Sequence, residues 1–156
     1  MNSTDSSQSQ VLRLAEYWPY LVTVLSDRIA RRTTKIVKEQ AGLNLSQWRV
    51  MAAIGEVPGR TSREVVQVTP MDKGIVSRAT KALLKEGLIV RAASQVDGRV
   101  SYLYLTEKGT RVYKRLIPEV EGVLERAGEA LSEADQSQMS ELLSALMSVI
   151  PDLRES

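Results

Sequence analysis

The segment DGRVSYLYLTEKG, residues 97–109, constrains the fold more than any other part of the chain. Its apolar residues alternate with a period of two, which places Leu103 and Leu105 on one buried face of a strand. The segment LIVRAAS at 88–94 has the same character, so the two strands form a hairpin that turns at 95–98. On both sides of this hairpin the apolar period is helical. The chain is therefore predicted to be mainly α-helical with one small β-hairpin.

Proline positions and one broad apolar stripe refine the helix assignment. Pro19 is expected in the first turn of a helix, or at a kink between it and a shorter helix from about residue 11, and Pro118 is expected to kink a long helix. The last helix carries an apolar stripe that the first helix or a second copy of the chain must cover, and we expect a dimer. The predicted helices span 21–41, 46–56, 61–69, 72–86 and 107–131, with a last one from about Ser132.

Capping residues set the helix boundaries. Thr61 and Glu64 have the spacing of a capping box. The helices over 61–69 and 72–86 are joined by a tight turn, and the second is rich in exposed Lys, Arg and Ser, which is typical of a helix-turn-helix. The hairpin beside it is then a wing. The expected N-caps are Ser46, Thr61, Asp72 and Thr106, and the expected C-terminal stops are Gly42 and Gly87.

The charge is divided unevenly along the chain, although the net charge is only +2. Residues 60–115 carry twelve Lys/Arg against five Asp/Glu, a net of +7, whereas residues 116–156 carry two against nine, a net of −7. A basic middle beside an acidic final third indicates a module that binds a polyanion, held on a separate scaffold. The alternative is two solvated faces that differ in sign.

Composition argues against several classes of function. The chain of 156 residues has no cysteine and no histidine, so it lacks thiolate nucleophiles and the commonest general base and metal ligand. No metal, no cofactor and no catalytic residues are expected, and we predict that the protein is not an enzyme. No apolar run is long enough to cross a membrane, and a cytoplasmic location is expected. Residues 1–10 are polar and are predicted to be a disordered tail.

The order of elements resembles that of the MarR family of bacterial transcriptional regulators. The segments LSQWRVM (45–51) and DKGIVSRA (72–79) resemble its second helix and its recognition helix. The resemblance implies a homodimeric winged helix-turn-helix that binds a pseudo-palindromic operator, usually as a repressor, and releases it on binding a small aromatic acid or acyl-thioester. The family's wing pattern D-x-R-x-x-x-L-x-L-T-x-x-G is matched by Asp97, Arg99, Leu103, Leu105, Thr106 and Gly109.

A domain organisation follows from the helix pattern and the resemblance. Residues 11–44 and 116–156 are expected to form a helical dimerisation region, and residues 45–115 the DNA-binding region. In the recognition helix, the residues outside the buried stripe would meet the major groove, and Arg78 is the best candidate to read a base. Gly74 either lets the backbone approach a phosphate or is neutral in an exposed turn. The recognition-helix candidates for DNA binding are Lys73, Gly74, Ser77, Arg78 and Lys81.

The preceding helix and the wing supply further candidates. Thr61, Ser62 and Arg63 begin a helix whose N–H groups and hydroxyls suit a phosphate, although Thr61 is expected to act mainly as a cap. Arg99 at the wing tip is the candidate for the minor groove. Asp97 is expected to brace Arg99 or the turn. The alternatives are an ordinary solvated helix face and an Asp-Gly turn chosen for its backbone geometry.

An effector site is suggested by aromatic and basic residues on two helices. In relatives these helices wall the ligand cleft, so Arg28 would pair with a ligand carboxylate and the aromatic rings would stack on the ligand. Core and dimer packing, and a surface ion pair for Arg28, are the competing interpretations. An effector-independent module that organises DNA or contacts proteins is the alternative function. The candidate effector residues are Trp18, Tyr20, Arg28, Trp48 and Met51.

Overall fold

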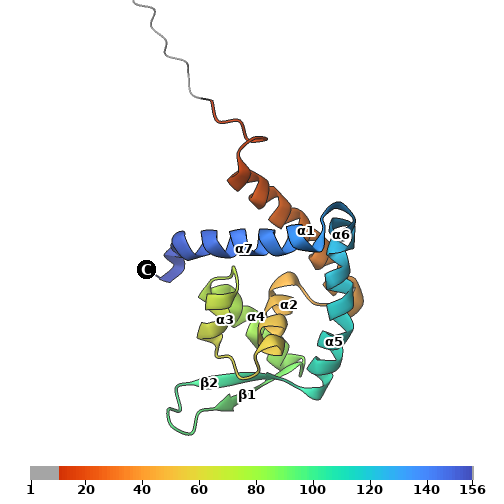
Figure 1. Ribbon diagram of the computed structural model, residues 1–156. Helices are drawn as coiled ribbons and strands as arrows, with labels where there is room; N and C mark the ends of the chain where they lie inside the picture. The colour runs from red at the N-terminus through yellow and green to blue at the C-terminus, as the bar shows by residue number, and fades with distance from the viewer. Residues whose placement is uncertain (1–10, 156) are drawn as a thin grey trace, which may run out of the picture.

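The computed structural model describes residues 11–155, and Figure 1 shows the arrangement of their elements. The predicted fold class is confirmed: the described chain is mainly helical, with one two-stranded antiparallel hairpin at its edge. The predicted tail over 1–10 lies outside the described residues. In chain order the elements are α1 (Trp18–Ala41), α2 (Leu45–Glu56), α3 (Ser62–Val68), α4 (Lys73–Lys85), β1 (Ile89–Ala93), β2 (Ser101–Leu105), α5 (Glu107–Glu121), the 3-10 helix η1 (Gly122–Leu124), α6 (Glu125–Ala130), α7 (Glu133–Val149) and the 3-10 helix η2 (Leu153–Glu155).

The core lies among α2, α3, α4 and the hairpin, with α1 and α5 packed against it (Figure 1). Trp48, Met51 and Ile54 of α2 and Val76, Ala79 and Leu83 of α4 are buried, while Ile75 and Leu84 of α4 are partly buried. Removing these side chains from water supplies the main stabilisation of the region, at about 1.5–3 kcal/mol for each large apolar side chain. The fully buried side chains include Val37, Leu43, Val50, Met51, Ile54, Val65, Val76, Leu83, Ile89, Leu103 and Leu116.

A third stretch of backbone joins the hairpin, and the sequence pattern gave no sign of it. The N–H of Gly59 donates to the carbonyl of Leu103 (2.9 Å), and the N–H of Leu103 donates to the carbonyl of Arg60 (3.1 Å). Thr61 forms an isolated antiparallel bridge with Tyr102. The start of α3 is therefore attached to the wing, so α3 and the hairpin hold each other in place.

Gly109 closes the wing pattern because α5 approaches Leu88, the residue directly before β1, too closely for any side chain. A Cβ at Gly109 would stand 1.9 Å from the carbonyl oxygen of Leu88. The hydroxyl of Thr106 donates to the carbonyl of Gly87 (2.7 Å) and accepts the N–H of Gly109 (2.9 Å). Thr106 thus caps α5, as predicted, and also attaches it to the end of the recognition helix.

Two predicted boundaries are wrong, and one alternative is settled. Asn44, not Ser46, caps α2, because its side chain accepts the N–H of Gln47 and the Gln47 side chain accepts the N–H of Asn44, each at 2.8 Å. Among the described residues no helix precedes α1: residues 14–16 form a turn. Pro19 lies in the first turn of α1, which confirms one of the two positions predicted for it.

The long helix predicted over 107–131 is the second wrong boundary. α5 continues through Pro118 and ends at Glu121, and η1 separates it from α6. Pro118 cannot donate a backbone hydrogen bond, and Gly122 has a low helix propensity. These two positions one turn apart account for the interruption.

Helices α1 and α7 leave large apolar side chains exposed. The exposed fractions are 52 % for Trp18 and 51 % for Leu25 in α1, and 58 % for Leu142 and 71 % for Met147 in α7. Within the described chain, no helix is long and apolar enough to cross a membrane. In water these faces are unfavourable unless another surface covers them.

Candidate nucleic-acid interface

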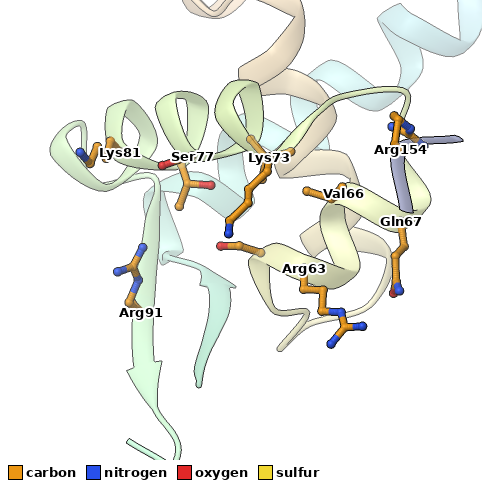
Figure 2. A pocket seen from close by; sticks show the side chains of 11 residues that line it. Arg63, Val66, Gln67, Lys73, Ser77, Lys81, Arg91 and Arg154 are labelled. Carbon is orange, nitrogen blue, oxygen red and sulfur yellow. The ribbon is translucent and has the colours of Figure 1, made fainter. Parts of the chain in front are cut away.

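A groove with basic side chains opens between α3, α4 and β1, as Figure 2 shows. Its volume is about 690 Å³. Val66 and Val76 are its apolar lining residues, and all three elements contribute cationic side chains, from Arg63, Lys73, Lys81 and Arg91. The remaining lining residues are Ser62, Gln67, Ser77, Thr80 and Arg154.

The N-terminus of α3 is fixed by the predicted capping box. The Thr61 hydroxyl accepts the N–H of Glu64 (3.2 Å), and the Glu64 carboxylate accepts both the N–H (2.7 Å) and the hydroxyl (2.8 Å) of Thr61. These hydrogen bonds lower the pKa of Glu64, and the one from the Thr61 backbone has the largest effect. The Thr61 side chain is thus engaged as a cap, and Ser62 and Arg63 are the residues of this N-terminus that line the groove.

The recognition helix α4 begins at Lys73 because the Asp72 carboxylate accepts the N–H of Ile75 (2.8 Å). The predicted polar residues, Lys73, Ser77, Arg78 and Lys81, are all exposed on this helix. Gly74 lies beside them, and a Cβ there would stand 3.2 Å from the Asp72 carboxylate and 3.4 Å from the Arg78 guanidinium. The absence of a side chain therefore gives both charged groups room at the start of the helix.

The wing tip is held by backbone hydrogen bonds that the side chains of Ser94 and Asp97 accept. The Asp97 carboxylate accepts the backbone N–H of Arg99 (3.0 Å), and the Ser94 hydroxyl accepts the N–H groups of Val96 and Asp97, each at 3.2 Å. Gly98 does not have a positive φ, so the turn does not depend on left-handed glycine geometry. Asp97 thus braces the backbone that presents Arg99.

The groove brings together half of the ten residues suggested by the sequence: Ser62, Arg63, Lys73, Ser77 and Lys81. Thr61, Gly74, Arg78, Asp97 and Arg99 lie outside its lining. Sequence reasoning missed Gln67, Arg91 and Arg154.

Arg91 could have been found from the alternation of the strands. It pairs with the buried Leu103, and residues directly opposite one another in an antiparallel pair point to the same side of the sheet. Arg154 gave no local signal, because it reaches the groove from the far end of the chain.

A second, smaller cavity lies between α1, α2, α5 and α7, with a volume of about 370 Å³. Trp48 lines it and stacks on Tyr113, with ring centroids 5.8 Å apart. Arg49 lines it too, and partial burial lowers the pKa of its guanidinium. The other lining residues are Val22, Leu25, Ser26, Ile29, Ala30, Thr33, Leu45, Val120 and Leu143.

The remaining effector candidates lie elsewhere in a single copy of the chain. Trp18, Tyr20 and Arg28 are exposed on α1, outside the lining of this cavity, and Met51 is fully buried in the core. Arg49 is a cation that sequence reasoning missed. Its place in α2, directly after Trp48, was the available signal. Among the described residues, no group of three or more His, Cys, Asp or Glu could hold a metal ion.

Comparison with known proteins gives a consistent assignment. The sequence model of the MarR family matches residues 41–100. The chain is 27 % identical over 108 residues to the HTH-type transcriptional regulator BilQ of Clostridium symbiosum, covering 69 % of this chain and 75 % of BilQ.

Two solved structures share the fold. A MarR-family regulator from Silicibacter pomeroyi superposes with a TM-score of 0.78 at 24 % identity, over 92 % of this chain and 99 % of that one. CouR from Rhodococcus jostii, solved with p-coumaroyl-CoA, superposes with a TM-score of 0.79 at 20 % identity, over 91 % and 99 % of the two chains. The winged helix-turn-helix and these matches agree: the chain is similar to the MarR family of transcriptional regulators, in sequence over residues 41–100 and in fold over most of its length.

Proposed function

We propose that this regulator is a homodimeric repressor of a pseudo-palindromic operator, released by a small aromatic acid or a related acyl-thioester. The observation that carries the proposal is the basic groove between α3, α4 and β1. The side chains of Arg63, Lys73, Lys81 and Arg91 suit the phosphates of duplex DNA, which supply most of the affinity of such proteins. A regulator with this partner works in the cytoplasm, with the chromosome.

Recognition of the DNA sequence is assigned to α4 and the wing. Arg78 is exposed in the first half of α4, and a guanidinium can form two hydrogen bonds with guanine, worth about 1–3 kcal/mol of discrimination. Arg99 at the wing tip is assigned to the minor groove. Ser62 and Arg63 at the start of α3, and Lys73, Ser77 and Lys81 on α4, are assigned to phosphates and groove edges. Thr61, Gly74 and Asp97 shape the backbone that carries these groups.

Dimerisation is assigned to the exposed apolar faces of α1 and α7, in the regions 11–44 and 116–156. Side chains such as Leu25 and Leu142, each more than half exposed, would be covered by the same helices of a second copy. Truncation after Leu131 removes α7 and is expected to give monomeric or insoluble protein, measured by light scattering. A soluble dimer of normal size after this truncation would contradict the assignment.

The cavity between α1, α2, α5 and α7 is proposed as the effector site. Trp48 offers a ring face and Arg49 a partly desolvated cation, which together suit an aromatic acid or its thioester. CouR, which has the same fold, was solved with such a thioester. The other effector candidates from the sequence do not line this cavity and stay untested: Trp18, Tyr20, Arg28 and Met51.

The effector proposal is tested with two arginine variants. Release of DNA by p-coumaroyl-CoA and by free aromatic acids is measured for Arg49→Gln and, as a matched control, for the exposed Arg28→Gln. We expect Arg49→Gln to lose the response and Arg28→Gln to keep it. The opposite pattern would return the role to Arg28. No response in the parent would favour the alternative, an effector-independent DNA-organising module.

The direction of regulation is tested by transcription in vitro from the protein's own upstream region. We expect added protein to lower transcript levels at concentrations that occupy the DNA. A rise in transcript would identify an activator, and no change at full occupancy would favour the DNA-organising alternative.

A further inference from the structure

Arg154, in the segment after α7, holds the turn of the helix-turn-helix. Its Nη1 donates to the carbonyl oxygens of Thr69 (2.6 Å) and Met71 (3.0 Å), which lie 85 and 83 residues earlier in the chain. Both carbonyls belong to the short connection between α3 and α4. Figure 2 shows Arg154 on its separate segment beside this connection, at one end of the groove.

Among the described residues, the other side-chain hydrogen bonds of the turn stay within one helix each, while the Met71 side chain is buried in the core. The Thr69 hydroxyl donates to the carbonyl of Val65 in α3 (2.7 Å), and the Asp72 carboxylate accepts the N–H of Ile75 in α4 (2.8 Å). Carbonyls at the end of a helix have no partner within it. The Arg154 guanidinium donates to one carbonyl on each side of the turn, those of Thr69 and Met71. A charged donor makes a stronger hydrogen bond than a neutral one.

Asp152 holds the guanidinium in the orientation that this contact needs. Arg154 Nε donates to the two carboxylate oxygens of Asp152 at 2.9 and 3.0 Å, and the backbone N–H of Arg154 donates to the same carboxylate at 3.0 Å. These bonds lower the pKa of Asp152 to about 2, so its carboxylate is charged at neutral pH. The pair forms a rigid unit on a segment that directly follows α7.

We propose that Arg154 is a positioning residue for DNA recognition, which fixes α4 relative to α3 from the segment that follows α7. The inference rests on the proposed DNA function. Because α3 presents Ser62 and Arg63 to the groove while α4 presents Lys73, a change in the angle between the helices separates groups that must contact one duplex together. The segment after α7 is thus part of the DNA-binding machinery without being a base-reading element.

The competing interpretation is that Arg154 only adds positive charge near DNA phosphates. The two interpretations predict opposite signs for the Asp152→Asn variant. If only charge matters, removal of a carboxylate near the groove tightens DNA binding, and Arg154→Lys binds like the parent. If the turn must be positioned, both variants weaken binding, because neither holds a guanidinium across the two carbonyls.

The test uses the full chain, with duplex DNA from upstream of the protein's own coding region and a random duplex as probes. We expect Arg154→Lys and Asp152→Asn each to weaken binding by about tenfold, the typical effect of one hydrogen bond to a charged group. In the absence of DNA, both should speed hydrogen–deuterium exchange of residues 66–76. The matched controls are Arg31→Lys and Asp27→Asn, an exposed arginine–aspartate pair on α1 that should change neither quantity.

The outcomes separate the proposal from the function on which it rests. Unchanged exchange in the turn, or faster exchange with unchanged DNA affinity, overturns the positioning role. Tighter binding by Asp152→Asn also overturns it, in favour of a simple charge effect. If the parent itself binds neither duplex, the DNA function fails, and the role of Arg154 in recognition fails with it.

Discussion

Substitution of Gly109 by alanine tests the packing of the wing against the helix that follows it. The added Cβ would stand 1.9 Å from the Leu88 carbonyl oxygen, whereas real Cβ contacts essentially never fall below 3.0 Å. The backbone of α5 must therefore move away from Leu88 by about 1.1 Å or more. That carbonyl also accepts the N–H of Thr106 (3.0 Å), and the Thr106 hydroxyl donates to Gly87 (2.7 Å), so the movement weakens both hydrogen bonds.

The magnitude follows from three effects. Overpacking of this kind costs about 1–3 kcal/mol. Two weakened hydrogen bonds cost about 0.5–1.5 kcal/mol each. Alanine recovers roughly 1 kcal/mol of helix propensity relative to glycine. The free energy of unfolding should fall by about 1–5 kcal/mol, a large part of the roughly 5–15 kcal/mol that a domain has.

Urea unfolding followed by circular dichroism measures this change, at one fixed protein concentration because dimerisation would add stability. Gly122→Ala is the matched control, since a Cβ there would meet only the flexible Glu125 carboxylate, at 3.4 Å. The control should be neutral or slightly stabilising. If Gly109→Ala is as stable as Gly122→Ala, the close approach of α5 to β1 does not explain this glycine.

Three further predictions concern the DNA face and its supports. Arg78→Ala should lower specific DNA binding, and Arg99→Ala should weaken binding with less loss of sequence preference; anisotropy titration measures both, and parental binding by both variants would contradict the assigned surface. The Asp152 carboxylate has its pKa lowered to about 2, so its contribution to stability is present above pH 4 and is lost as the pH falls from about 4 to about 2. In acid unfolding, parent and Asp152→Asn should therefore differ above pH 4 and converge below it, and a constant difference would contradict this. Thr80 Oγ1 is buried without a hydrogen-bond partner among the described residues, so Thr80→Val should raise the free energy of unfolding by about 1 kcal/mol; a loss of stability in urea unfolding would show that the hydroxyl is satisfied.

Much of the fold could be predicted because local patterns agree with the tertiary structure. Helical spacing in α2 and α4, the period of two in the hairpin and the caps Thr61, Asp72 and Thr106 each act over a few residues. The wrong prediction of the α2 cap also concerns contacts over a few residues. Asn44 and Ser46 are both good N-caps, and the choice between them depends on which one Gln47 can answer.

The site was predictable only in part. The exposed positions of α4 follow from its buried stripe, since a residue off that stripe must face outward. The groove, however, combines α3, α4, β1 and η2, and their juxtaposition depends on contacts between distant parts of the chain. Arg154 contacts Thr69 and Met71 across more than eighty residues, which no local pattern encodes. Arg49 was missed for the same reason, since α1, α5 and α7 close the cavity around it.

The central claim is that the groove of α3, α4 and β1 recognises a specific DNA sequence. Fluorescence-anisotropy titration tests it most directly, with DNA from upstream of the protein's own gene compared with random DNA of equal length at matched salt. We predict a preference of about a thousandfold or more for the upstream DNA. Equal and weak binding to both duplexes would contradict the account of a sequence-specific repressor.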